Sequence, residues 1–89
     1  MIKNIRLKSN RTRAKAIKYT GKNASEIQSF LEVPVREEKN HEYLIIQGIK
    51  VLKNNWVVRN IMTNPETMDV WFDVMDTKLL KEKYNVKEN

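Results

Sequence analysis

The stretch KYTGKNASEIQSFL, from Lys18 to Leu31, contains the clearest local pattern in the chain. It is typical of the end of a strand, a turn through Gly21 and a helix that begins after Asn23. Asn is a preferred N-cap residue, and Glu26 follows it at the three-residue spacing of a capping box. The pattern therefore predicts a strand-turn-helix unit in which these two side chains cap the helix.

The helix has one apolar stripe, because Ile27, Phe30 and Leu31 recur at the spacing of one helical face. Pro34 ends it, since the residue before a proline is pushed away from helical geometry. With the N-terminal backbone groups already capped, we interpret the junction as a structural turn rather than a phosphate cradle.

The segment before the turn, residues 14–20, alternates as a strand does. This alternation places Ile17 and Tyr19 toward the core and Lys18 outward. Residues 1–10 contain apolar side chains without a clean period. We therefore expect residues 1–13 to be a basic N-terminal arm or an edge strand of a single domain that spans residues 1–89.

Beyond Pro34 the segments differ in polarity and period, which predicts their structure. In order, they are a polar loop at 34–41, a bent strand or a tight hairpin at 43–52, a turn at 53–55, a strand at 56–62, a turn at 63–67, an alternating strand at 68–75, and a helix at 77–84 capped by Asp76 or Thr77.

This order of elements predicts an α+β fold. We expect a small, mostly antiparallel sheet of about four strands with two helices to one side, in the order β-α-β-β-β-α.

The charge is concentrated at one end of the chain. Residues 1–22 carry eight Lys and Arg and no acid, whereas residues 23–89 carry nine basic and eleven acidic residues, which together give the net charge of +6. Such a segment attracts anions, whether nucleic acid, nucleotide or acidic protein, without choosing among them. A solvated basic surface is the alternative interpretation.

The inventory of catalytic groups is small. The chain has no Cys, and His41 is its only histidine, which argues against a metal site. The common loops that bind nucleotide phosphates, GxxxxGK[ST] and GxGxxG, are absent, and we interpret Asp69 and Asp73 as a polar strand face. We therefore expect a protein that is not an enzyme, with no cofactor and no catalytic or metal-ligating residue.

Neither an apolar run of about 18 residues nor the apolar core of a signal peptide is present. We therefore expect a protein outside the membrane that stays where it is made. A chain of 89 residues buries a limited core, so we also expect a homo-oligomer.

The sequence offers several side chains for binding an anionic nucleotide. Cations would hold phosphates and an aromatic ring would stack on a base, although we favour a core position for Trp56. Trp71 is a candidate anchor for a partner protein, although we favour a buried contact with a helix or another subunit. The candidate ligand contacts are Arg13, Lys18, Lys22 and Arg59 for charge, and Trp56 or Tyr19 for stacking.

Residues 14–85 resemble a group of small phage-encoded accessory proteins of the PGDYG-like type. That group has an aromatic-Thr-Gly-x-Asn segment, a helix with Glu, Ile and Phe-Leu, a Gly-Asp-Trp turn, an aromatic strand and a closing helix with Tyr. Asn54 and Asn55 here stand in place of its Gly-Asp pair. The matching residues are Tyr19, Thr20, Gly21, Asn23, Glu26, Ile27, Phe30, Leu31, Trp56, Phe72 and Tyr84.

The resemblance implies a phage protein in the host cytoplasm that acts by binding. It is similar in this respect to the oligomeric phage sponges for cyclic nucleotides, so we expect a non-enzymatic counter-defence protein that sequesters an anionic signalling nucleotide, such as a cyclic dinucleotide. Two alternatives stay open. The chain would inhibit a host protein through Trp71, or it would bind nucleic acid through its basic arm.

Overall fold

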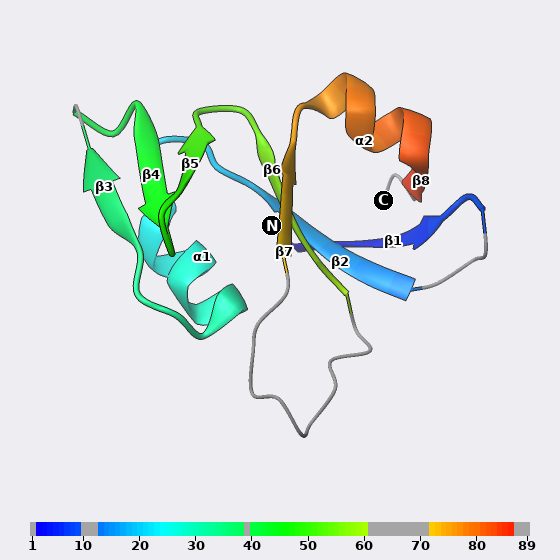
Figure 1. The fold of residues 1–89 in the computed structure, drawn as a ribbon, viewed down its shortest axis with the longest axis horizontal. Helices are drawn as coiled ribbons and strands as arrows, with labels where there is room; N and C mark the ends of the chain where they lie inside the picture. The colour runs from blue at the N-terminus through cyan, green and yellow to red at the C-terminus, as the bar shows by residue number, and fades with distance from the viewer. Residues whose placement is uncertain (1, 10–12, 39, 61–71, 87–89) are drawn as a thin grey trace.

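The computed structural model describes residues 2–9, 13–38, 40–60 and 72–86. This part contains two helices and eight antiparallel strands, in a five-stranded sheet of order β7-β6-β2-β1-β8 and a three-stranded sheet of order β3-β4-β5 (Figure 1). The elements are β1 (Ile2–Leu7), β2 (Arg13–Lys18), α1 (Ala24–Leu31), β3 (Arg36–Glu38), β4 (Tyr43–Ile46), β5 (Ile49–Leu52), β6 (Trp56–Asn60), β7 (Phe72–Met75), α2 (Thr77–Lys83) and β8 (Tyr84–Val86).

The α+β class and the antiparallel pairing are thus confirmed, whereas the number and order of the strands differ from the prediction. The predicted turn at 63–67 and the first half of the strand predicted at 68–75 lie outside the described residues.

β1 is an inner strand of the larger sheet. Ile5 is opposite Ala14 of β2 on one side and opposite Val86 of β8 on the other. The strand β1, which was expected in an arm or edge strand, therefore lies between two partner strands, and Ile5 and Arg6 are paired on both sides. One of these partners comes from the other end of the chain, which is why no local pattern revealed it.

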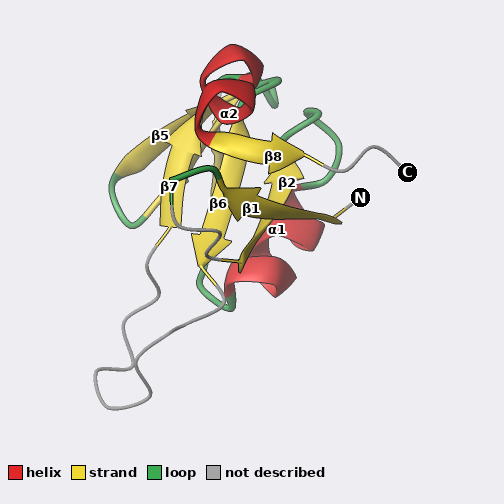
Figure 2. Cartoon of the chain, turned by 90° about the vertical axis from the view of Figure 1, so that its right-hand side faces the viewer, coloured by secondary structure: helices red, strands yellow, loops and turns green. Residues whose placement is uncertain are grey.

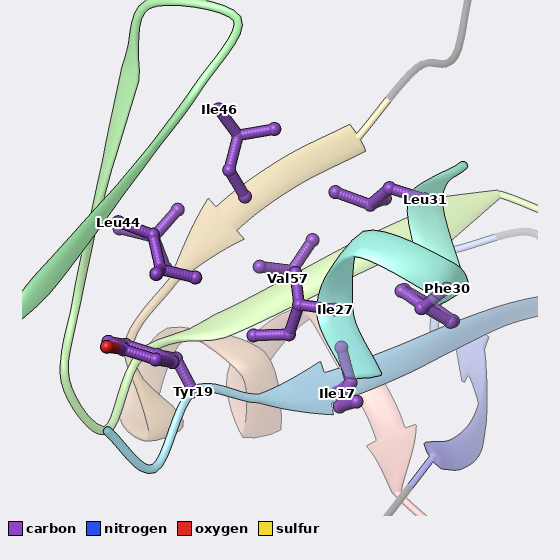
Figure 3. Close-up of a cluster of buried hydrophobic side chains, with 9 residues drawn as sticks. Ile17, Tyr19, Ile27, Phe30, Leu31, Leu44, Ile46 and Val57 are labelled. Carbon is purple, nitrogen blue, oxygen red and sulfur yellow. The ribbon is translucent and has the colours of Figure 1, made fainter. Parts of the chain in front are cut away.

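The two helices cover opposite faces of the five-stranded sheet (Figure 2). Ile17 and Val57 pack against α1, and Ala16 and Val58 pack in the cluster that contains Leu80 of α2. The expectation that both helices lie to one side was wrong, because β2 and β6 are apolar on both faces. The core under α1 (Figure 3) comprises Ile17, Tyr19, Ile27, Phe30, Leu31, Leu44, Ile46, Val51 and Val57.

The smaller sheet contains the hairpin β4–β5. Gln47 and Gly48 connect its strands with φ values of 50° and 81°, as in a tight two-residue turn. The hairpin alternative for residues 43–52 is therefore the correct one. β3 forms within the segment that was predicted as a loop, because its residues Arg36–Glu38 pair with β4 although all three are charged.

The two helices begin differently. Asp76 caps α2, since its side chain accepts a hydrogen bond of 2.8 Å from the backbone N–H of Leu79. Asn23 precedes α1 but makes no such bond to the helix. Its amide instead accepts from the Thr20 N–H at 2.9 Å and donates to the Lys18 carbonyl at 2.8 Å. The Asn23 part of the predicted capping box is therefore wrong: this side chain stabilises the turn rather than the helix.

Gly21 lies in that turn with φ of 90°, and a Cβ placed on it would stand 3.3 Å from the backbone oxygen of His41. We expect Gly21→Ala to lower the free energy of unfolding by about 1–2 kcal/mol, from the left-handed backbone and the close carbonyl. Gly48→Ala is the matched control, because Gly48 has φ of 81° and no atom within 4 Å of such a Cβ. If urea unfolding shows the same decrease in the free energy of unfolding for both variants, the contact with the His41 carbonyl does not contribute to the cost at Gly21.

Candidate functional site

One face of the larger sheet extends beyond the part that α1 covers, and it is hollowed there. Arg6 lies opposite both Arg13 and Asn85, and Asn4 lies opposite Lys15 in the adjacent row. Because residues directly opposite each other share a face, these five side chains gather on one side of the sheet. They line a pocket of about 450 Å³, whose lining residues are Asn4, Ile5, Arg6, Arg13, Ala14, Lys15 and Asn85.

The pocket carries three cations without partners. Arg6, Arg13 and Lys15 are exposed, and their side chains form no ion pair or hydrogen bond within the described part of the chain. Two like charges directly opposite each other on a sheet destabilise it. The Arg6–Arg13 pair therefore costs the fold stability, a cost that a bound anion would offset.

Only one of the side chains predicted to contact a ligand lines this pocket, namely Arg13. Lys18 lies at the other end of β2, which at the rise of a strand is about 16 Å from Arg13. It is on the face of the sheet opposite to the pocket, beside Trp56. Lys22 is exposed in the turn that follows. The structure thus does not bring Arg13, Lys18 and Lys22, three of the four predicted cations, together.

Both aromatic rings proposed for stacking lie in the core. Tyr19 is 0% exposed, and its hydroxyl donates to the His41 carbonyl at 3.0 Å. Trp56 is 7% exposed, and its indole N–H donates to the Thr77 hydroxyl at 3.0 Å. The structure therefore supports the core interpretation of Trp56 and leaves neither ring free to stack on a base.

The face of Trp56 is also occupied by charge. The Nζ atoms of Lys3 and Lys18 lie 5.8 Å and 5.9 Å from the centre of its ring. We therefore interpret Lys18 as a cation–π contact of Trp56 within the fold, not as a contact of a ligand phosphate.

Arg59 shares a face with Lys15, its cross-strand neighbour, but its guanidinium is already used. Nη1 donates to the carbonyl of Phe30 at 2.7 Å, and Nη2 lies 3.5 Å from the Glu32 carboxylate. A cation at the C-terminus of a helix stabilises the free carbonyls and the helix dipole there. Arg59 of β6 thus links the C-terminal end of α1 to the larger sheet.

Trp71, the predicted partner anchor, lies outside the described residues.

Four polar residues of the pocket were not identified from the sequence: Asn4, Arg6, Lys15 and Asn85. Of these four, only Lys15 could have been identified from the sequence. It lies two residues after Arg13 and two before Ile17 in an alternating strand, so the three side chains share a face. The others depend on the pairing of β1 with β2 and β8, which no local pattern shows.

The described side chains of the pocket are suited to binding an anion. Guanidinium, ammonium and amide groups donate hydrogen bonds to phosphate or carboxylate oxygens. Among the described residues that line it, none has a carboxylate, hydroxyl, thiol or imidazole that would serve as a base or nucleophile. Among the described residues, no group of three or more His, Cys, Asp or Glu is placed to hold a metal ion.

Comparison of the chain with protein-family models, with curated proteins and with solved structures found no match. In the described ranges, neither helix has the length and apolar character needed to cross a membrane.

Burial raises the pKa of the Tyr19 phenol above its usual value of 10.0, and the nearby Glu37 carboxylate raises it further. Burial and then Asp73 raise the pKa of Tyr84 in the same way. Because the folded state favours the protonated phenols, their stabilisation is complete below about pH 10 and is lost as the pH rises above it. We expect the free energy of unfolding to fall as the pH rises above about 10. Tyr19→Phe should make the free energy of unfolding, measured by urea titration at several pH values, less dependent on pH above about 10. An unchanged pH dependence would contradict the role of Tyr19.

Proposed function

We propose that this protein is a non-enzymatic binding protein that sequesters an anionic nucleotide in the pocket formed by β1, β2 and β8. The observation that carries the proposal is the gathering in one hollow of the sheet of three exposed cations that have no partner among the described residues. A surface that only needed solubility would disperse such charges or pair them with acids. Asn4 and Asn85 add amide donors on the same face.

The size of the pocket supports a small ligand. Its volume of about 450 Å³ is within the range of about 300–1,000 Å³ that is usual for sites that bind small molecules. The resemblance to small phage accessory proteins supports the same class of ligand, since a host's signalling nucleotides are what a counter-defence protein would sequester. We propose that role in the host cytoplasm for this chain, together with a homo-oligomeric state.

Isothermal titration calorimetry tests the proposal directly. The purified protein is titrated with a cyclic dinucleotide, a nucleoside monophosphate and the matching unphosphorylated nucleoside. We expect stoichiometric binding of at least one phosphorylated ligand, no binding of the nucleoside, and no change in the ligand after incubation. Absence of heat with every phosphorylated ligand, and no nucleotide released by denaturing the purified protein, would overturn the proposal. Light scattering on the same sample checks the oligomeric state.

A further inference from the structure

The three cations of the pocket are arranged as one pair and one separate charge. Arg6 and Arg13 are directly opposite each other on β1 and β2, where Cβ atoms of facing residues lie about 4.5–5.5 Å apart. Two guanidinium groups so close together can hold one phosphate between them, each with two parallel hydrogen bonds. We call this pair subsite 1.

Lys15 provides the separate charge. It lies two residues after Arg13 on the same face, which is about 6.6 Å along a strand. Its neighbour across β1 is Asn4, an amide donor, whereas its neighbour across β6 is Arg59, whose guanidinium is bonded to α1. Lys15 and Asn4 therefore form a second place for an anion, which we call subsite 2.

Building on the proposed function, we infer that the pocket recognises two phosphates that are separated by a sugar, as in a dinucleotide. Adjacent phosphates of a nucleoside polyphosphate share one bridging oxygen, so they stand closer together than the two subsites. A dinucleotide places a whole ribose between its phosphates and spans both subsites. The ligand class is then a small phosphodiester-linked dinucleotide, linear or cyclic.

A long single strand fits the described surface less well. Proteins that bind such strands combine exposed stacking aromatics with many phosphate contacts. Here Tyr19 and Trp56 are buried, and the described lining of the pocket contributes three free cations. The geometry therefore favours a ligand that ends within the pocket.

A charge-matched pair of ligands tests the inference. ADP without magnesium and the 5′-phosphorylated dinucleotide pApA carry about the same charge near pH 7.5, but their phosphates are spaced differently. We expect pApA to bind about tenfold more tightly than ADP, because only pApA reaches the extra charge-assisted hydrogen bonds of subsite 2. We expect Lys15→Gln to remove this preference while it leaves AMP binding at subsite 1 within about threefold.

The outcomes separate the two proposals. If ADP binds as tightly as pApA, or Lys15→Gln weakens AMP and pApA equally, the two-phosphate inference is overturned while the nucleotide-binding function stands. If no nucleotide binds, the proposed function itself fails. If an oligoadenylate of about ten nucleotides binds far more tightly than pApA, with a steep loss of affinity in salt, the ligand is a polymer and the inference is overturned. Circular dichroism of Lys15→Gln confirms that the variant is folded.

Discussion

The double substitution Arg6→Gln and Arg13→Gln is expected to weaken nucleotide binding about 100-fold. Each guanidinium would supply charge-assisted hydrogen bonds to phosphate, and the loss of one such group costs about tenfold in affinity. Both side chains are exposed and without partners in the described chain, so the fold should not depend on them. Its stability should even rise slightly, since two facing like charges are removed.

The matched control is Lys22→Gln with Lys78→Gln, which removes the same net charge from two exposed positions outside the pocket. We expect this variant to bind within about threefold of the unmodified protein, because distant surface charges act only through screened, long-range attraction. Dissociation constants from calorimetry at one salt concentration make the comparison. Equal losses in both double variants would mean that the net charge of the protein, and not the pocket, attracts the ligand.

Tyr19→Ala is expected to lower the free energy of unfolding by about 3–5 kcal/mol, the usual cost of truncating a buried aromatic ring. The side chain is completely buried in the core between α1 and the two sheets (Figure 3). Domains of this size are stable by only about 5–10 kcal/mol, so the variant should be partly unfolded at moderate temperature. Urea unfolding followed by circular dichroism measures the loss.

Two comparisons show what the ring contributes. Tyr19→Phe keeps the ring and removes only the hydroxyl that bonds to His41, so we expect a loss of about 1 kcal/mol. Tyr43→Ala makes the same truncation on the half-buried hairpin, where the ring contacts the Lys50 ammonium at 4.3 Å. A loss for Tyr19→Ala no larger than that for Tyr43→Ala would contradict its place at the centre of the core.

The residues around Tyr19 explain which parts of the fold were predictable. Apolar periods identified α1 and the buried position of Ile17 on β2, because Ile27, Phe30 and Leu31 recur at helical spacing and Ile17 alternates with Lys18. Such patterns report on a single element and its buried side. They carry no information about which distant strand lies alongside.

The candidate site shows the limit of local patterns more clearly. Arg13 was identified because it is a cation in a basic segment, but so were Lys18 and Lys22, and only the sheet register separates them. Asn85 joins the pocket through pairing of β8 with β1, and β8 is three residues long. Side chains that already have an internal partner, such as Arg59 and Asn23, look identical in sequence to free ones.

The pairing of β1 with β8 also has a consequence for how the protein is made. A ribosome releases Arg6 well before Asn85, yet these two residues face each other across the sheet. Contacts between segments so far apart in sequence form slowly, because a long loop must close before they gain stability. The hollow that holds the three cations is therefore completed later than the pairing of β1 with β2, which supplies Arg6 and Arg13. A nascent chain still lacking β8 would present its basic strands to the surrounding RNA without a finished pocket.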